Sequence, residues 1–257
     1  RQAIYPVPFA RSLRPGAIIN QTGTGAHALT VKSAGSAEAG AALLAQNTHA
    51  TGGIGVWAQA GGNDAATVSK NTGSGALFKG FGNDGGEDEF RVNNNGSIET
   101  KADSYVFVPG AALVKNLSSD TTRWDIQANG SARIWRGATA GNKYVYYPLV
   151  IPTQLYGRAV KVENVTIYYR VADGTKGFII STELHKPTDA DSYAALVTDT
   201  TDRKSTTASS YTLTPTSNNV LSANEGLILL FYFNFSDDTN WVQIGGIRVQ
   251  LGHHSLY

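Results

Sequence analysis

The second part of the chain consists of short segments in which apolar and polar residues alternate. Residues 165–170 and 247–251 place aliphatic or aromatic side chains at every second position, with polar or charged side chains between them. Successive side chains on a β-strand point to opposite faces, so this pattern predicts strands with one buried and one hydrated face. Residues 227–233 lack the alternation and predict a central strand that is buried on both faces.

Two Asn-Gly pairs mark turns between predicted strands. Residues 125–134 carry Asn129-Gly130, and residues 89–98 carry Asn95-Gly96. We interpret the first pair as a two-residue hairpin turn, which needs a positive φ at both central positions. Roughly ten strand-like segments and no apolar stripe at helical spacing predict an all-β protein with helix content near zero. The pattern favours a jelly-roll-like β-sandwich head over residues 103–257.

The first hundred residues have a different character. They hold 17 of the 28 glycines but only 6 of the 25 aromatic residues. Apolar residues recur in this part at intervals shorter than the roughly 18 residues that a single-chain β-helix needs to close one coil. Three chains together could each supply one face of such a coil. Residues 17–102 therefore predict a glycine-rich stem of the trimeric β-helix or β-prism type, with a flexible linker as the alternative. Apolar residues recur every 10 to 14 positions at Ile18, Leu29, Leu43, Val56, Ala66, Leu77 and Phe90.

Residues 1–16 belong to neither part. Pro6, Pro8 and Pro15 disfavour a central strand, while several apolar side chains between them argue against a free tail. We expect this arm to act as a linker or to dock on a neighbouring fibre subunit or on a virion. The chain begins at Arg1 and contains no methionine, so we expect a processed or trimmed product.

Composition narrows the functional classes. The 257 residues are 41 % hydrophobic and 10 % aromatic, which is enough apolar material for a core. The 21 Lys and Arg residues nearly balance 20 Asp and Glu, and a formal net charge of +1 argues against nucleic acid as a partner. No apolar run approaches the roughly 18 residues of a membrane span. Cysteine is absent, which excludes disulfides and thiolate metal sites.

Aromatic residues crowd one stretch of the predicted head, together with arginines. Stacked rings beside planar hydrogen-bond donors suit sugars, whose faces are apolar and whose rims carry hydroxyl groups. We therefore expect a ligand-binding site for carbohydrate here, with packing in the sandwich core as the alternative for each ring. The candidate residues are Trp124, Trp135, Tyr144, Tyr146, Tyr156 and Arg136.

We expect no enzymatic activity, no catalytic residue, no metal and no cofactor. Glycan-cleaving enzymes place two carboxylates about 5 to 10 Å apart. The available carboxylates are not paired by their sequence spacing; they are Asp125, Glu163, Glu183, Glu225 and Asp237. We expect Asp189 and Asp191, and likewise residues 84–89, to form solvated acidic loops. Calcium binding through their carboxylates is the alternative at both places.

At this level the chain resembles a known class of proteins. The resemblance rests on Asn20-Gln-Thr-Gly-Thr-Gly25 before Ala28-Leu29, on Asn71-Thr-Gly-Ser-Gly75 before Ala76-Leu77, on Phe90-Arg-Val-Asn-Asn-Asn-Gly-Ser-Ile98, and on the aromatic β domain that follows. These features look like the distal parts of phage tail fibres, tailspikes and related bacterial surface fibres. The resemblance is architectural and carries no ligand or catalytic residue over to this chain. It implies a trimeric stalk, a terminal head and attachment to surface glycans.

Three functions follow as hypotheses. The first is an adhesin or receptor-binding fibre, a homotrimer located outside the cell or on a virion surface, whose head binds a carbohydrate or another cell-envelope receptor. The second is a structural subunit of an extracellular filament or a virion decoration, assembled through residues 1–16. A glycan-cleaving enzyme of the tailspike type is the third.

Overall fold

A computed structural model describes residues 56, 58, 65, 67–72, 74–81, 88–117, 120–139 and 141–253. Spatial proximity divides the chain into two units, Arg1–Val68 and Ser69–Tyr257, and nearly all described residues lie in the second. The predicted arm and most of the predicted stem therefore lie outside the described residues. The proposed boundary near residue 102 falls within a continuous strand, Ile98–Pro109, and the division into arm, stem and head stays a prediction.

Two antiparallel sheets form the second unit. Sheet A has eight strands: β1 (Phe78–Phe81), β2 (Asp88–Val92), β3 (Ile98–Pro109), β15 (Trp241–His253), β10 (Lys161–Val171) and β13 (Ser209–Leu213) in spatial order, plus β5 (Arg123–Ile126) and β6 (Ala132–Trp135), where β6 pairs with β15. Sheet B has five: β12 (Tyr193–Asp199), β11 (Gly177–Pro187), β14 (Leu227–Phe235), β7 (Lys143–Leu149) and β4 (Val114–Lys115). A separate short pair joins β8 (Gln154–Leu155) to β9 (Arg158–Ala159).

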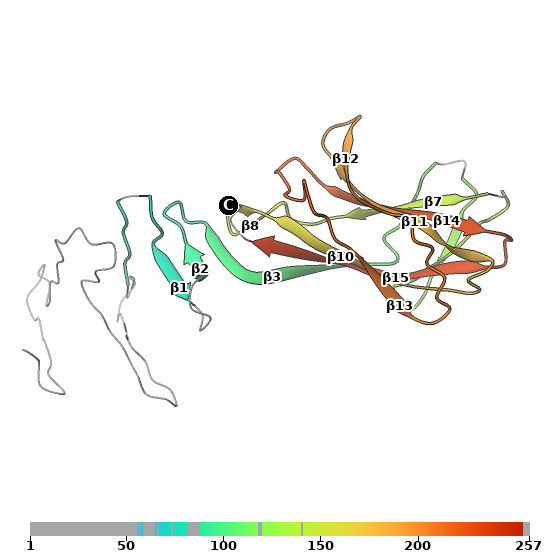
Figure 1. Cartoon of the computed structure of the whole chain (residues 1–257), viewed down its shortest axis with the longest axis horizontal. Helices are drawn as coiled ribbons and strands as arrows, with labels where there is room; N and C mark the ends of the chain where they lie inside the picture. The colour runs from blue at the N-terminus through green and yellow to red at the C-terminus, as the bar shows by residue number, and fades with distance from the viewer. Residues whose placement is uncertain are drawn as a thin grey trace, which may run out of the picture. The chain divides into compact units, whose positions relative to one another are not determined.

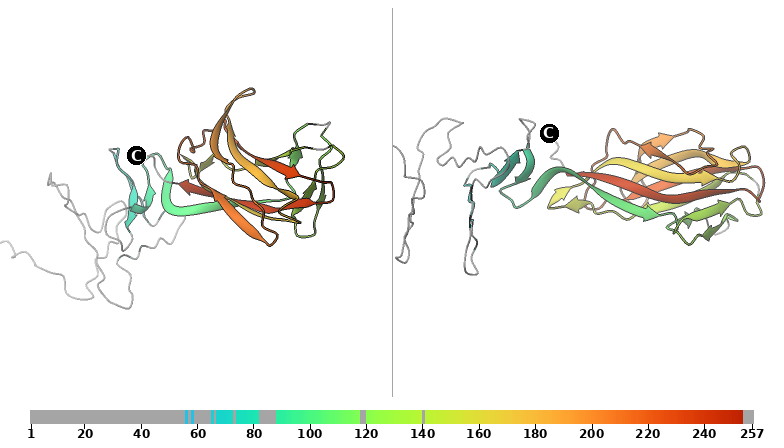
Figure 2. Two further views of the ribbon diagram at one scale, coloured as in Figure 1. Left: turned by 45° about the vertical axis from the view of Figure 1, so that its right-hand side comes forward. Right: turned by 90° about the horizontal axis from the view of Figure 1, so that it is seen from below.

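The two sheets pack face to face as a β-sandwich. Figures 1 and 2 show β7, β11 and β14 in one layer and β3, β10, β13 and β15 in the other. The described residues contain strands and turns and no helix, which confirms the all-β prediction. None of this part of the chain therefore forms a helix with the length and hydropathy of a membrane span.

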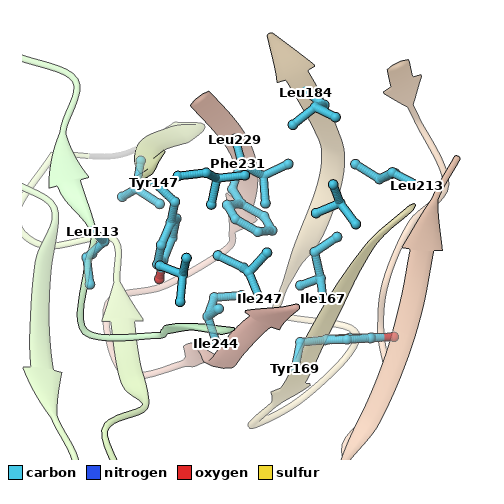
Figure 3. Packing of buried hydrophobic residues seen from close by; sticks show 14 of the residues in the cluster. Leu113, Tyr147, Ile167, Tyr169, Leu184, Leu213, Leu229, Phe231, Ile244 and Ile247 are labelled. Carbon is cyan, nitrogen blue, oxygen red and sulfur yellow. The ribbon is translucent and has the colours of Figure 1, made fainter. Parts of the chain in front are cut away.

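The core lies between the inner faces of the two sheets. Figure 3 shows Ile167 and Ile247 from sheet A pointing toward Leu184 and Phe231 from sheet B, and all four are fully buried. The ring of Tyr147 meets Phe231 edge to face, with 5.3 Å between the ring centroids. Its hydroxyl group donates a hydrogen bond of 2.9 Å to the Gly110 carbonyl oxygen, so the one polar atom of this ring is satisfied.

The alternation of residues 165–170 and 247–251 is confirmed in β10 and β15 except at Thr166, which is buried on the face predicted to be hydrated. The prediction for residues 227–233 is only partly correct. Strand β14 is central in sheet B, between β11 and β7, but Ile228 and Tyr232 remain partly accessible on the outer face. Only Leu230 is buried on that face, at 4 % exposure. The inner positions are buried by sheet A, while the outer positions are shielded only by side chains of neighbouring strands.

The turn at Asn129-Gly130 joins β5 to β6 as predicted, but its type differs. Only Gly130 has a positive φ, of 78°, and its N–H donates to the Gln127 carbonyl oxygen at 2.9 Å. The Gln127 N–H donates to the Ser131 carbonyl oxygen at 2.8 Å, so the hairpin has a three-residue loop with a glycine bulge. Asn129 Oδ1 accepts hydrogen bonds from the N–H and the hydroxyl group of Ser131, which keeps Asn129 out of the left-handed region.

The second turn has the same construction. Gly96 has a φ of 83°, and its N–H donates to the Asn93 carbonyl oxygen at 3.0 Å. Asn95 Oδ1 accepts from the N–H and the hydroxyl group of Ser97, as Asn129 does from Ser131. The hairpin predicted over residues 89–98 is thus present between β2 and β3. The shared Asn-Gly-Ser sequence accounts for the shared geometry.

Replacing Gly130 with alanine is expected to lower the free energy of unfolding by about 1 kcal/mol, because a Cβ atom is strained at this positive φ. Urea unfolding of the two proteins measures the difference. Gly226→Ala is the matched control, since Gly226 has no atom within 4 Å of an added Cβ and no positive φ. Equal losses for both variants would contradict the assigned turn.

A partly buried ion pair links strand β7 to the loop that precedes β5. Lys143 Nζ lies 3.4 Å from Asp120 Oδ1, and the same oxygen accepts hydrogen bonds of 2.8 Å from the N–H and the hydroxyl group of Thr122. Burial acts to raise the pKa of Asp120, but the Thr122 hydrogen bonds and the Lys143 ammonium outweigh it and hold the pKa below its ordinary value near 3.8.

This pKa shift predicts how stability depends on pH. A carboxyl group with a lowered pKa in the folded state stabilises the protein above its unfolded pKa, and this contribution is lost as the pH falls through the folded pKa. Asp120→Asn keeps the acceptor for Thr122 but removes the charge. The difference in unfolding free energy between wild type and variant should be largest near neutral pH and should shrink below a pH of 3.8. A difference that stays constant from pH 7 to pH 2 would contradict this role.

Candidate functional site

The outer face of sheet A carries a cluster of aromatic and planar polar side chains. On β15, Val242 and Ile244 point into the core, so Trp241 and Gln243 point outward. Gln243 lies directly opposite Arg133 on β6 and directly opposite Arg170 on β10. Three neighbouring strands therefore bring one amide and two guanidinium groups into a single row.

Gln243 fixes both arginines. The Nε of Arg133 and the Nε of Arg170 donate to Gln243 Oε1, at 3.3 Å and 3.0 Å. The other end of the same amide donates to the Ser131 hydroxyl oxygen at 2.5 Å. Gln243 is only 7 % exposed, so the hydrogen bonds of its amide are largely shielded from water. The amide orientation and the position of both guanidinium groups are mutually dependent.

Trp241 completes this cluster. The guanidinium carbons of Arg133 and Arg170 lie 4.7 Å and 5.3 Å from the centre of the Trp241 ring, which is the range of cation–π contacts. We call Arg133, Arg170, Trp241 and Gln243 the arginine–tryptophan platform. Next to it, on the same face, Arg123 lies 5.8 Å from the centre of the Trp135 ring.

A hollow of about 490 Å³ opens beside the platform. Its size lies within the range of about 300 to 1,000 Å³ typical of small-ligand pockets. Strands β10, β13 and β15 and the β5–β6 turn contribute its walls. The lining residues are Asn129, Tyr168, Tyr169, Arg170, Ala208, Ser209, Ser210, Gln243 and Gly245.

A β-bulge in β15 shapes the hollow. Tyr168 lies opposite Gly246 and Tyr169 lies opposite Ile244, so Gly245 is an extra residue without a partner. A Cβ atom on Gly246 would come within 2.2 Å of the Phe107 ring, whereas a Cβ atom on Gly245 would meet Tyr168 at an ordinary 3.5 Å. Glycine at position 246 therefore lets the Phe107 ring lie close to the strand, and glycine at 245 leaves the hollow open.

The six predicted site residues do not form one cluster. Trp135 is on the outer face of sheet A, and Arg136 follows it and donates to the Ser236 carbonyl oxygen at 3.3 Å. Trp124 pairs with buried Ile134 and packs against the core, with Lys115 Nζ 5.5 Å from its ring centre. This outcome matches the alternative that the ring serves core packing.

Two further predicted residues lie on the outer face of the other sheet. Tyr144 meets Tyr232 edge to face at 4.6 Å between ring centroids, and the Tyr146 hydroxyl group donates to Asn116 Oδ1 at 3.1 Å. Burial, and then the neighbouring Glu183 carboxylate, raise the pKa of Tyr232 to about 12, so this hydroxyl group stays protonated at neutral pH.

The remaining predicted residue, Tyr156, is far from either set in the fold. It lies in the turn between β8 and β9 with a φ of 54°, and its ring is exposed. The ring meets His253 edge to face, at 5.7 Å between centroids. It contributes to neither the platform nor the hollow as the structure describes them.

The described residues contain no group of three or more metal-binding side chains placed to share an ion. Asp189, a calcium alternative, accepts hydrogen bonds from the N–H groups of Asp191 and Ser192 and from the Ser192 hydroxyl group. These bonds hold its carboxylate in a local turn and lower its pKa. The other alternative, residues 84–89, lies almost entirely outside the described residues.

Sequence reasoning missed most of the site that the structure assembles. Tyr168 and Arg170 belong to the hydrated face that the alternation of residues 165–170 predicts, and Gln243 and Trp241 occupy the corresponding face of the last strand. That alternation was the available signal. It identifies the face but does not show which strands are neighbours.

Comparisons of the sequence with known proteins identify no relative of this chain. No protein-family model matches it, and a search of curated proteins gives no match. Solved structures with some similarity include the CBM22-1 xylan-binding domain of Paenibacillus barcinonensis Xyn10C, at 12 % identity and a TM-score of 0.40 over 61 % of this chain and 99 % of that one.

Two further structures are similar at the same level. The xylan-binding module CBM15 has 11 % identity and a TM-score of 0.37 over 60 % of this chain and 100 % of that one. The K1 cleaved adhesin domain of Lys-gingipain from Porphyromonas gingivalis W83 has 10 % identity and a TM-score of 0.34 over 57 % and 97 %. These scores are too low to transfer a ligand or a residue role to this chain.

Proposed function

We propose that this protein binds a carbohydrate through the outer face of sheet A. The observation that carries the proposal is the hollow itself, where Tyr168 supplies a ring and Asn129, Arg170 and Gln243 supply planar polar groups. A sugar offers an apolar face to a ring and hydroxyl groups to planar donors and acceptors. The platform beside the hollow adds two guanidinium groups whose positions are fixed before any ligand arrives.

Binding is favoured over glycan cleavage by the surroundings of the acidic residues. Glu163 lies 3.1 Å from Lys161 Nζ, Glu225 lies 3.2 Å from Lys186 Nζ, and Glu183 lies 2.8 Å from His185 Nε2. Each of these carboxylates already has a basic partner. None of the three lines the hollow.

Saturable binding to immobilised polysaccharides tests this function. We would incubate the full chain with an array of neutral and acidic cell-surface glycans and titrate every positive spot. The proposal predicts saturable binding to at least one glycan, with no new reducing ends released during prolonged incubation. An array without any saturable signal contradicts carbohydrate binding, and released reducing ends would support the glycan-cleaving alternative instead.

We further propose that the binding head belongs to a trimeric surface fibre, as the sequence resemblance implies. Phe78 on β1 and Phe90 on β2 are exposed, at 46 % and 43 %, and a second or third chain would cover such rings. Light scattering should then give about three times 27.3 kDa. A monomer contradicts the trimer. Polymers that disappear when residues 1–16 are deleted would support the filament subunit.

A further inference from the structure

Three arginines on the outer face of sheet A have no carboxylate partner in the part of the chain that the structure describes. Arg123, Arg133 and Arg170 make no ion pair within 4.0 Å with any carboxylate of the described residues. Asp125 lies across from Arg133 on β5 but remains beyond that distance. Some cations elsewhere in the sandwich do face a carboxylate, as Lys143 and Lys186 do.

The terminal nitrogens of the two platform arginines are available to bind a ligand. Each uses only its Nε in a hydrogen bond, and both Nε atoms donate to the same Gln243 oxygen. The terminal Nη nitrogens of Arg133 and Arg170 have no hydrogen-bond partner among the described residues. Stacking against Trp241 restricts both side chains, so little conformational entropy is lost when an anion binds.

We propose that the ligand is an acidic glycan, whose carboxylate or sulfate group is bound by the Nη atoms of Arg133 and Arg170 while an adjacent sugar ring occupies the hollow. This inference rests on the proposed carbohydrate-binding function. Planar guanidinium groups match the two oxygens of such an anion, and charge-assisted hydrogen bonds are stronger than those to a neutral hydroxyl group. A neutral sugar would cover these cations without compensating their charge.

A sugar anion fits this face better than a nucleic acid does. The whole chain has a formal net charge of only +1, so it lacks the broad basic surface that a phosphate backbone needs. Arg133 and Arg170 instead form a small cluster of guanidinium groups beside one hollow. Single-stranded DNA is therefore a competitor in the test below rather than the proposed ligand.

Matched pairs of glycans provide the experiment. Oligogalacturonate is compared with its methyl ester, sialylated glycans with their desialylated forms, and sulfated glycans with their desulfated forms, by calorimetry and on the array. We expect at least one acidic member to bind about tenfold or more tightly than its neutral partner. Raising the salt concentration should weaken that binding, because exposed charges are screened.

Variants of the arginine–tryptophan platform test whether the preference for acidic glycans arises there. Arg170→Gln should weaken binding of the acidic glycan about tenfold more than it weakens binding of the neutral partner, since only the acidic glycan loses a charge-assisted hydrogen bond. Lys176→Gln removes the same charge from an exposed position that does not line the hollow, and it should have no effect. Thermal unfolding of each variant confirms that it is folded.

The outcomes separate this inference from the function on which it rests. Saturable binding of neutral glycans with no acidic preference would overturn the acidic ligand and leave carbohydrate binding intact. Absence of binding to every glycan would overturn both. Binding of single-stranded DNA as tight as that of the best acidic glycan would overturn the inference in favour of a general polyanion site.

Discussion

Replacing Trp241 with alanine should weaken glycan binding about 100-fold. The indole ring contacts the guanidinium groups of Arg133 and Arg170, so its removal frees both side chains as well as deleting an aromatic surface. Residues of this kind, aromatic and central to a binding surface, typically carry most of the binding energy. Isothermal titration with the tightest glycan from the array measures the effect.

An exposed aromatic residue on the opposite sheet supplies the control. Tyr193 is 61 % exposed and stacks on His185 with 4.2 Å between ring centroids. It lies on β12 of sheet B, so Tyr193→Ala should leave the affinity unchanged. If instead Tyr193→Ala weakens binding and Trp241→Ala does not, the ligand binds sheet B and the assignment of the site is wrong.

Filling the hollow should abolish binding without unfolding the protein. Gly245 lines the hollow, has no positive φ, and its added Cβ would meet Tyr168 at 3.5 Å, so the backbone accepts a side chain here. We expect the branched end of a leucine at this position to enter the hollow. We expect Gly245→Leu to reduce affinity more than 100-fold, because the side chain occupies the space of the sugar ring. Equilibrium binding and a thermal unfolding curve, recorded on the same sample, measure the two effects separately.

Gly226→Leu is the matched control for this change. The position has no atom within 4 Å of an added Cβ and lies in the segment before β14, away from the lining residues. Its affinity should equal that of the wild type. A Gly245→Leu protein that is folded and still binds the glycan at wild-type affinity would show that the hollow is not the site.

The hydrated face of sheet A could be predicted from sequence, but the platform could not. Alternation within residues 165–170 places Tyr168 and Arg170 on one face, because this depends only on the local period of a strand. The contact of Arg133 with Gln243 joins residues 110 positions apart, and that of Arg170 with Gln243 joins residues 73 apart. Such contacts depend on which strands pair and in which register.

The predicted site residues lie on different faces for a related reason, and their role in ligand binding stays a prediction. Trp135 and Tyr144 are close in sequence, but the chain leaves sheet A after β6 and enters sheet B at β7. Their side chains therefore belong to the outer faces of opposite sheets. In a sandwich, residues one connection apart are often on different layers, and nearness in sequence is then a poor guide to a shared surface.

The turns show where local sequence was informative and where it was not. Asn-Gly correctly located both hairpins, since glycine accepts the positive φ that each turn requires. The serine after each glycine decided the type of turn, because it donates two hydrogen bonds to the asparagine side chain and favours the three-residue loop. The two-residue interpretation overlooked that serine.

Mapping of the bound glycan by NMR tests the central claim most directly. Titrating the ¹⁵N-labelled chain with the tightest array glycan should shift the indole N–H signal of Trp241 and the backbone signals of Gln243 and Gly245, in proportion to saturation. Signals from β11, β12 and β14 of sheet B should stay in place. Shifts confined to sheet B, or saturable binding without any shift at Trp241 and Gly245, would contradict a glycan site on the outer face of sheet A.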